Sequence, residues 1–101
     1  MISQKEGLRR FKVLQEQAYR KMVKKNKDYA IPKDFLSNFR ESERFGETTI
    51  MGAMNRASDK WSRLCNIIKN REINVKDETL KDTLIDLSNY ALLILIASEE
   101  K

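Results

Sequence analysis

The sequence predicts an all-α protein, a bundle of about four helices formed by a single domain over residues 1–101. Three observations support this fold class. Apolar residues recur at intervals of three and four along most of the chain, which is the period of an amphipathic helix. One proline, three glycines and 35% charged residues suit a helical protein. Capping and turn residues separate the periodic segments. A chain of this length buries a modest core, so we expect oligomerisation to complete the bundle.

The first helix is expected from Lys5 to about Asp28. Its apolar stripe consists of Leu8, Phe11, Leu14, Ala18 and Met22. Residues 1–33 hold ten Lys and Arg against three acids, a net charge of +7, whereas the rest holds ten against twelve, a net charge of −2. Anions should therefore be drawn to this helix. Its basic cluster lacks interleaved aromatic residues and any known reader motif, which disfavours a nucleic-acid partner.

An irregular segment follows, over about residues 28–47, and is the expected wall of a pocket. Within it, Asp34 is suited to cap a short second helix that runs to about Phe45. Gly46 should end that helix.

A third helix is expected from Thr48 or Thr49 to about Asn70. The residues at near-heptad spacing, expected in the core, are Ile50, Met54, Ala57, Trp61, Leu64 and Ile68. Beside them runs a polar stripe of Asn55, Asp59, Arg63 and Asn66. This stripe is either a solvated face with a local Asp59–Arg63 ion pair or one wall of a groove shared with the last helix.

The fourth helix, expected over Lys76–Ala97, carries Glu78, Asp82, Asp86 and Asn89 on one stripe and is then apolar on every face. We expect its second half to be buried all round. The loop Arg71–Lys76 is short enough to make this helix an antiparallel neighbour of the third. An all-apolar helix needs more cover than a chain of 101 residues provides. We therefore expect at least a homodimer, built on Leu84–Ile96 and the third helix.

Acids in a semi-enclosed stripe repel one another unless a cation or a set of donors compensates. A metal ion is one compensation; structural ion pairs, or the ordinary preference for acids in the first turn of a helix, are the alternatives. The chain has no histidine and a single cysteine, Cys65, so a metal site must use oxygen ligands. Oxygen ligands select Mg²⁺, Mn²⁺ or Ca²⁺.

Four segments in order resemble the nucleotide-modification-associated domain 1 family of phages and bacteria. They are the KNKDY run Lys25–Tyr29, the pair Asn38–Phe39, the DKWSRL run Asp59–Leu64 and the segment Val75–Tyr90. The corresponding family patterns are KNxDYG, NF, DK-x-x-RL and DE-x-x-x-DT-x-x-DL-x-x-Y. Ala30 stands where the family usually has glycine.

The last helix is also similar to the last metal-binding helix of the MazG and dimeric dUTPase type of all-α nucleoside-triphosphate pyrophosphohydrolase. That resemblance implies a MazG-like bundle, a Mg²⁺ cofactor and the release of pyrophosphate from a nucleotide. The chain departs from the pattern in two ways. Its acids are spaced by four, and Asp59 is the only acidic residue between Ile50 and Asn70.

Three functions follow as hypotheses. The first is a Mg²⁺-dependent pyrophosphohydrolase, in which Glu78, Asp82, Asp86 and Asp59 hold the ion and Asp82 and Asp86 are the catalytic pair. The residues expected to bind the nucleotide are Lys25, Asn26, Asp28, Tyr29, Asn38, Lys60, Arg63 and Asn89. The second is a protein that sequesters a modified or signalling nucleotide, with Arg63 pairing the carboxylates in place of a metal. The third is a structural bundle. The missing second acidic pair favours sequestration over hydrolysis.

The longest apolar run, Tyr90–Ala97, is too short to cross a bilayer, and the opening MISQKEGLRR lacks a signal-peptide core. We therefore expect no membrane partner and a cytoplasmic location, which is the host cytoplasm if a phage encodes the chain.

Overall fold

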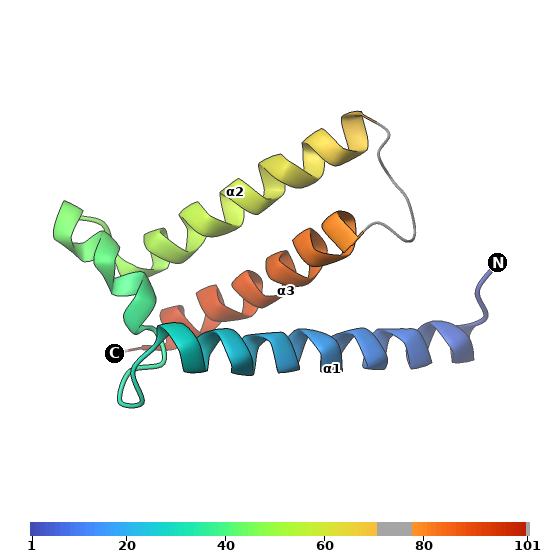
Figure 1. Ribbon diagram of the computed structural model, residues 1–101, viewed down its shortest axis with the longest axis horizontal. Helices are drawn as coiled ribbons and strands as arrows, with labels where there is room; N and C mark the ends of the chain where they lie inside the picture. Colours follow the sequence, from blue (N-terminus) through green and yellow to red (C-terminus); the bar gives the residue numbers. More distant parts are fainter. Residues whose placement is uncertain (71–77, 101) are drawn as a thin grey trace.

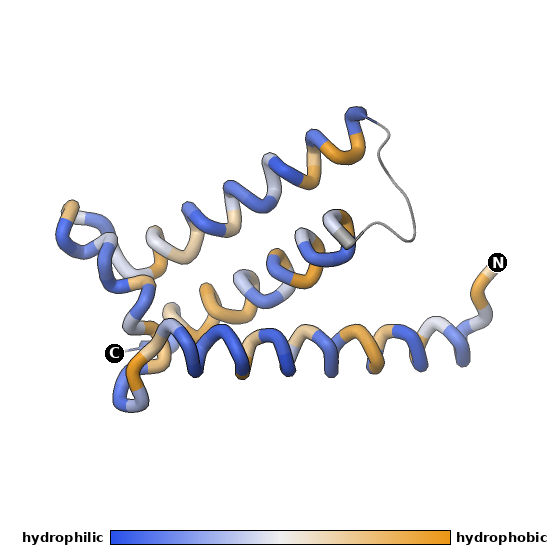
Figure 2. Tube along the Cα trace, in the orientation of Figure 1, coloured by the Kyte–Doolittle hydropathy of each residue, from blue (hydrophilic) through white to orange (hydrophobic). Residues whose placement is uncertain are grey.

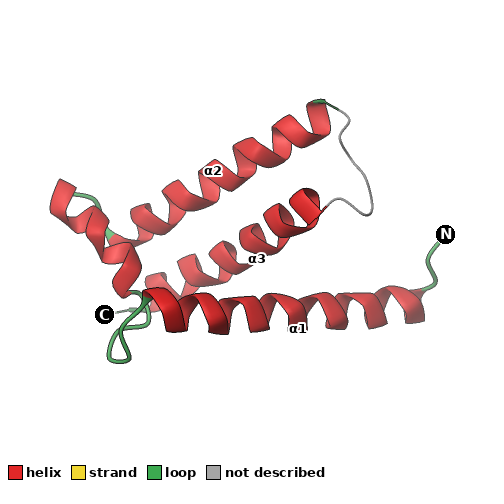
Figure 3. Ribbon diagram, in the orientation of Figure 1, coloured by secondary structure: helices red, strands yellow, loops and turns green. Residues whose placement is uncertain are grey.

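The structure, a computed structural model, describes residues 1–70 and 78–100. The elements in chain order are α1 (Gln4–Tyr29), the 3₁₀ helix η1 (Ser37–Phe45), α2 (Thr49–Lys69) and α3 (Glu78–Glu99) (Figure 1). Throughout these residues the elements are helices joined by loops (Figure 3). The predicted all-α bundle is therefore confirmed.

Side-chain caps begin the helices close to the predicted positions. The Ser3 hydroxyl accepts a hydrogen bond from the Glu6 N–H at 3.1 Å, and the Thr48 hydroxyl accepts one from the Met51 N–H at 3.1 Å. Gly46 has a φ of 81°, the left-handed conformation that ends η1 as expected. The predicted loop Arg71–Lys76 lies outside the described residues.

The second helix differs from the prediction in type and start. It begins at Ser37 and is a 3₁₀ helix. Asp34 acts earlier, because its carboxylate accepts the Leu36 N–H at 3.2 Å and so holds the turn that precedes η1.

The helix α3 lies between the other two long helices (Figure 1). α2 runs antiparallel to α3, as predicted, and α1 runs in the same direction as α3. The first turns of α1 project beyond the ends of α2 and α3. Leu8 and Phe11, which were expected on a packed stripe, are therefore 64% and 62% exposed.

The core lies where η1, α2 and the second half of α3 meet. It consists of Leu36, Phe39, Ala53, Leu93 and Ala97. Hydrophobic residues dominate that half of α3, whereas they alternate with hydrophilic ones along α1 and α2 (Figure 2). Gly52 permits the close approach of α2 to η1, since a Cβ there would lie 2.6 Å from the Ser42 Oγ and 2.8 Å from the Phe39 carbonyl oxygen.

The prediction that Trp61 lies in the core on α2 is wrong. Trp61 is 59% exposed in the chain, and the apolar residues buried on this helix are Ala53, Leu64 and Ile67. Apolar side chains cover more than one face of α2. The face that contains the small Ala53 is the one that packs on its neighbours.

The second half of α3 is not buried all round, contrary to the prediction. Leu93 and Ala97 are buried, but Leu92, Leu95 and Ile96 are 60%, 54% and 42% exposed. The reason is that α1 and α2 cover two sides of α3 and leave other sides open.

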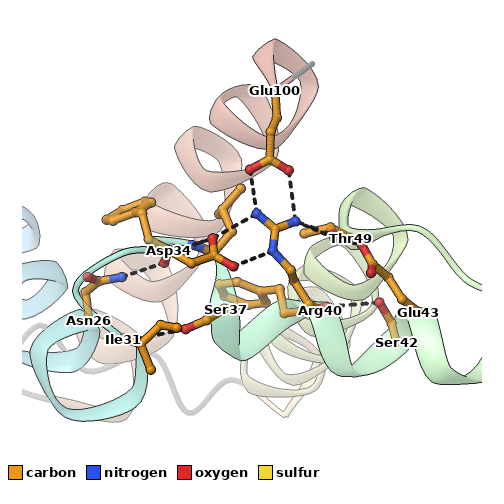
Figure 4. A network of polar contacts seen from close by, with 12 residues as sticks. Asn26, Ile31, Asp34, Ser37, Arg40, Ser42, Glu43, Thr49 and Glu100 are labelled. Atoms are coloured by element: carbon orange, nitrogen blue, oxygen red, sulfur yellow. Dashed lines mark hydrogen bonds and ion pairs between the residues drawn. The ribbon is translucent and has the colours of Figure 1, made fainter.

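The guanidinium of Arg40 joins η1 to three other parts of the chain (Figure 4). It donates to the Asp34 carboxylate at 2.5 and 2.8 Å and to the Glu100 carboxylate at 2.6 and 2.9 Å. It also donates to the Thr49 hydroxyl at 3.1 Å. These hydrogen bonds hold the pKa of both carboxyl groups below their ordinary values and raise the pKa of Arg40. We call this set the Arg40 clamp.

Replacing Arg40 should weaken the protein most at neutral pH. A carboxyl group with a lowered pKa stabilises the folded state above its ordinary pKa of about 4, and the contribution is lost as the pH falls through the lowered value. Arg40→Met should therefore lower the melting temperature at pH 7 and flatten its decline towards acid pH, as thermal melts across a pH series can measure. Arg44→Met is the control, because Arg44 pairs with Glu41 on the same helix but its side chain is 73% exposed. An Arg40 variant that melts like the Arg44 variant would contradict the clamp.

Candidate functional site

The buried carboxylate of Asp86 is the centre of the candidate site. Asp86 lies on the inward face of α3 and is 6% exposed. Three ammonium groups surround it. The Lys21 Nζ lies 2.6 Å and the Lys25 Nζ 3.4 Å from its Oδ1, and the Lys60 Nζ lies 3.0 Å from its Oδ2. We call these four residues the lysine–aspartate cluster.

Helical spacing and long side chains assemble this cluster. Lys21 and Lys25 are one turn apart on α1 and therefore share a face, whereas Lys60 comes from α2 on the other side of α3. The side chains of Lys21 and Lys60 are only 27% and 26% exposed. Their aliphatic stems cross the packed surfaces and deliver the charged ends to Asp86.

The cluster keeps Asp86 ionised and leaves an excess of positive charge. Burial raises the pKa of the Asp86 carboxyl, but hydrogen bonds from Lys21 and Lys60 and the nearby charge of Lys25 outweigh that effect and hold its pKa below the ordinary value. Three cations against one anion give these four residues a net charge of +2, which the largely exposed Asp82, 3.8 Å from the Lys21 Nζ, partly offsets. Such a site attracts a second anion.

A cavity of about 340 Å³ adjoins the cluster. Lys25 and Asp86 form part of its wall, together with Arg56 of α2 and Asn38 of η1. Its volume lies at the small end of the range of roughly 300–1,000 Å³ that is usual for ligand pockets. We call it the basic cavity.

Aromatic rings form another part of the cavity wall. Phe39 and Tyr90 meet edge to face, with ring centroids 6.2 Å apart and an interplanar angle of 84°. The guanidinium carbon of Arg56 lies 5.6 Å from the centroid of the Phe39 ring. Tyr29 also lines the cavity and is 68% exposed. The cavity therefore presents cations and π-systems side by side.

Asn38 contributes an unsatisfied acceptor. Its Oδ1 is buried and has no hydrogen-bond partner among the described residues. A buried polar atom without a partner is uncommon and costs free energy, on the order of 1–3 kcal/mol. Asn38 lines the basic cavity and also a separate cavity of about 300 Å³.

Most of the residues predicted to bind a nucleotide come together here. Five of them line the basic cavity together with Asp86, which was predicted as a catalytic and metal-binding residue: Lys25, Asn26, Tyr29, Asn38 and Asn89. Lys60 joins them through its ion pair with Asp86. Two of the amides also hold the backbone, because the Asn26 Nδ2 donates to the Phe35 carbonyl at 2.8 Å and the Asn89 Nδ2 donates to the Ala18 carbonyl at 3.0 Å.

Other predicted residues lie elsewhere. Asp28 and Arg63 are exposed and are not part of the cavity wall. The predicted pairing of Arg63 with Asp86 is wrong, since lysines from α1 and α2 take that place. The polar stripe of α2 that contains Arg63 is a solvated face, which was one of its two predicted interpretations.

The predicted magnesium ligands are not assembled. Asp82 has a side chain that is 64% exposed and lies 3.8 Å from the Lys21 Nζ, while Asp59 is exposed and lines a separate cavity of about 300 Å³. The side chain of Glu78 is outside the described part of the chain. Among the described residues, no group of three or more acidic, histidine or cysteine side chains can hold a metal ion. These residues do not fit Mg²⁺, because three ammonium groups already neutralise Asp86 and would repel a divalent cation.

Sequence reasoning did not select Lys21, Arg56, Phe39 or Tyr90 for the site. Helical spacing could have predicted two of them, because Lys21 precedes Lys25 by one turn and Arg56 precedes Lys60 by one turn. Residues one turn apart lie on the same face of a helix. Phe39 and Tyr90 were indistinguishable from ordinary core aromatics until the fold placed them on a cavity wall.

The chain matches no protein-family model, no curated protein and no solved structure. The resemblance to the nucleotide-modification-associated domain 1 family therefore rests on the four motifs alone. None of the described helices combines the length and the apolar character that a bilayer span requires.

Removing the charge of Asp86 should destabilise the protein. Asp86→Asn leaves three neighbouring ammonium groups without their common anion. We expect the free energy of unfolding to fall by about 1–3 kcal/mol. This is less than the roughly 3–5 kcal/mol lost when a fully buried ion pair is broken, because the lysines are partly exposed. Asp82→Asn is the matched control and should change little. Urea unfolding of both variants, with EDTA and with Mg²⁺, measures the difference. A Mg²⁺-dependent gain in stability in the parent that Asp82→Asn abolishes would contradict the neutralisation of Asp86 by lysines and support a metal site.

Proposed function

We propose that the protein binds a nucleotide in the basic cavity and does not hydrolyse it. The observation that carries the proposal is the lysine–aspartate cluster, a site with a net charge of +2 beside a cavity with aromatic and amide walls. A ligand with a negative end and an aromatic, hydrogen-bonding end is complementary to this combination. A nucleotide has both ends.

The phosphate end of the ligand is assigned to the cationic side of the cavity. Lys25 is the lysine of the cluster that lies on the cavity wall, and Arg56 on the same wall supplies a planar guanidinium. Both side chains favour phosphate oxygens through charge-assisted hydrogen bonds. Lys21 and Lys60 hold Asp86 and maintain the positive potential.

The base end is assigned to Asn38 and the aromatic residues. The buried Asn38 Oδ1 has an unused acceptor position, which suits an amino or imino group of a base. Tyr29, which is exposed, and Tyr90 offer ring surfaces for stacking. The volume of about 340 Å³ favours a mononucleotide over a dinucleotide.

Hydrolysis is the less supported hypothesis. It needs Asp82 and Asp86 to share a metal ion with further carboxylates, whereas Asp82 is largely exposed and Asp86 is paired with lysines. A purely structural bundle is disfavoured by the cavity and by the unsatisfied Asn38. The motif resemblance supports a phage or bacterial protein that acts on a cytoplasmic nucleotide pool.

Nucleotide binding should persist in EDTA. We expect calorimetry with a panel of mononucleotides to detect binding without Mg²⁺, with an affinity that falls as salt is added because the contacts are ionic. Lys25→Met should weaken binding about tenfold or more, which is the effect of losing one charge-assisted hydrogen bond.

Lys24→Met is the control for that experiment, since Lys24 is exposed and adjacent and the variant has the same net charge. Chromatography of the same mixtures should return the nucleotides unchanged. Mg²⁺-dependent product would contradict binding without hydrolysis. An absence of binding across the panel would favour the structural bundle.

The protein is also proposed to act as a homo-oligomer, at least a dimer. Large apolar side chains on α2 and α3 support this, because Trp61, Leu92 and Leu95 are each more than half exposed in the single chain. Light scattering at tens of micromolar should give a mass of at least twice 11.9 kDa. A monomeric mass at that concentration would contradict the proposal.

A further inference from the structure

A straight apolar stripe lies on the surface of α2. Its six exposed residues follow each other at intervals of three and four: Met51, Met54, Ser58, Trp61, Cys65 and Ile68. This is the a/d spacing of a two-helix interface. The residues that pack α2 on its neighbours within the chain lie on a different face, which includes Ala53, Leu64 and Ile67. We call the exposed set the Trp61 stripe.

The Trp61 stripe is complementary to itself when two copies run antiparallel. With a two-fold axis between Asp59 and Lys60, Ser58 faces the partner's Trp61 and Trp61 faces the partner's Ser58. The same axis pairs Met51 with the partner's Ile68. A bulky side chain thus meets a small one at the centre, which lets the two helices approach closely.

Charge favours the same orientation. Glu47, whose carboxylate accepts a hydrogen bond from the Asn55 amide at 2.9 Å, and Lys69 are exposed and lie at opposite ends of the stripe. The antiparallel pairing places Glu47 near the partner's Lys69 at both ends, whereas a parallel pairing places Lys69 beside the partner's Lys69. Like charges at such flanking positions disfavour the parallel form.

The area of the stripe is sufficient for a modest dimer. Met51, Met54, Trp61 and Ile68 are 42%, 45%, 59% and 51% exposed. Each then offers on the order of 100 Å² of apolar surface. With the flanking atoms, two copies bury roughly 1,000 Å², which is near the lower limit for a specific interface.

We propose that a second copy of this chain docks on the Trp61 stripe, forming an antiparallel α2–α2 contact with Trp61 packed over the partner's Ser58. The inference rests on the proposed homodimer and specifies its surface and register. It is independent of the nucleotide, so its experiments are done without one.

A cysteine placed at position 54 tests the register. In the antiparallel contact Met54 faces the partner's Cys65. The two Cys65 residues of the dimer are instead eleven positions apart along the stripe, a separation of about 16 Å. That distance is too long for a disulfide. Mild oxidation of Met54→Cys should therefore give a covalent dimer on a non-reducing gel. The parent, which has Cys65 alone, should remain uncrosslinked. The double variant Met54→Cys/Cys65→Ser should also remain uncrosslinked, because its two introduced cysteines are equally far apart.

A charge placed on the stripe tests the surface. Trp61→Glu should give a monomer in sedimentation velocity at a concentration where the parent is dimeric. Asn66→Glu, which adds the same charge on the solvated face of α2, should leave the parent's dimer unchanged. Circular dichroism checks that both variants stay helical. Because Trp61 is the only tryptophan, the parent's emission should shift to shorter wavelength as the concentration rises.

The outcomes separate the two proposals. A dimer that Trp61→Glu leaves intact, or a parent that crosslinks through Cys65 alone, overturns the antiparallel stripe and keeps the homodimer. A parent that is monomeric at tens of micromolar overturns both. Concentration-dependent dimerisation that Trp61→Glu abolishes, together with crosslinking of Met54→Cys, supports the stripe and its register.

Discussion

The packing of the three long helices depends on how one buried carboxylate, that of Asp86, is neutralised. Asp86 lies on the inward face of the central helix, where an ionised group is stable only if charge is brought to it. Lys21 and Lys25 reach it from α1, and Lys60 reaches it from α2. The same neutralisation therefore ties both outer helices to α3 and creates the positive site beside the basic cavity. Packing and site chemistry depend on one set of ion pairs.

Lysines neutralise Asp86, and this limits the chemistry that the site can support. A divalent cation needs several oxygen ligands that are free of other cations. In the described part of the chain the acids are dispersed: Asp59 lies on the solvated face of α2 and Asp82 is largely exposed. Ammonium groups bind anions without activating water in the way a metal ion does. This arrangement supports the proposal that the site binds a phosphate group without hydrolysing it.

The arrangement of the helices leaves apolar side chains of α2 and α3 exposed. α1 packs on one side of α3 and α2 on the other. The 3₁₀ helix η1 covers one end of the bundle and is held there by the Arg40 clamp. Apolar residues that these elements do not cover remain on α2 and α3, with Trp61 the largest of them. In the proposed homodimer, a second copy of the chain covers part of this apolar surface through a symmetric contact.

The sequence alone determined the helices, their order, most of their ends and the inward position of Asp86 and Asn89, because helical periodicity and capping are local properties. Five of the residues predicted to bind the nucleotide, together with Asp86, line one cavity in the structure. Only the tertiary structure decided which face of α2 packs inward, since its apolar residues cover more than one face and Trp61 was as suited to the core as Ala53. It also decided that lysines, and not Arg63 or a metal ion, neutralise Asp86. Such a choice depends on which side chains from separate helices arrive within a few ångströms, and no spacing within one helix encodes it.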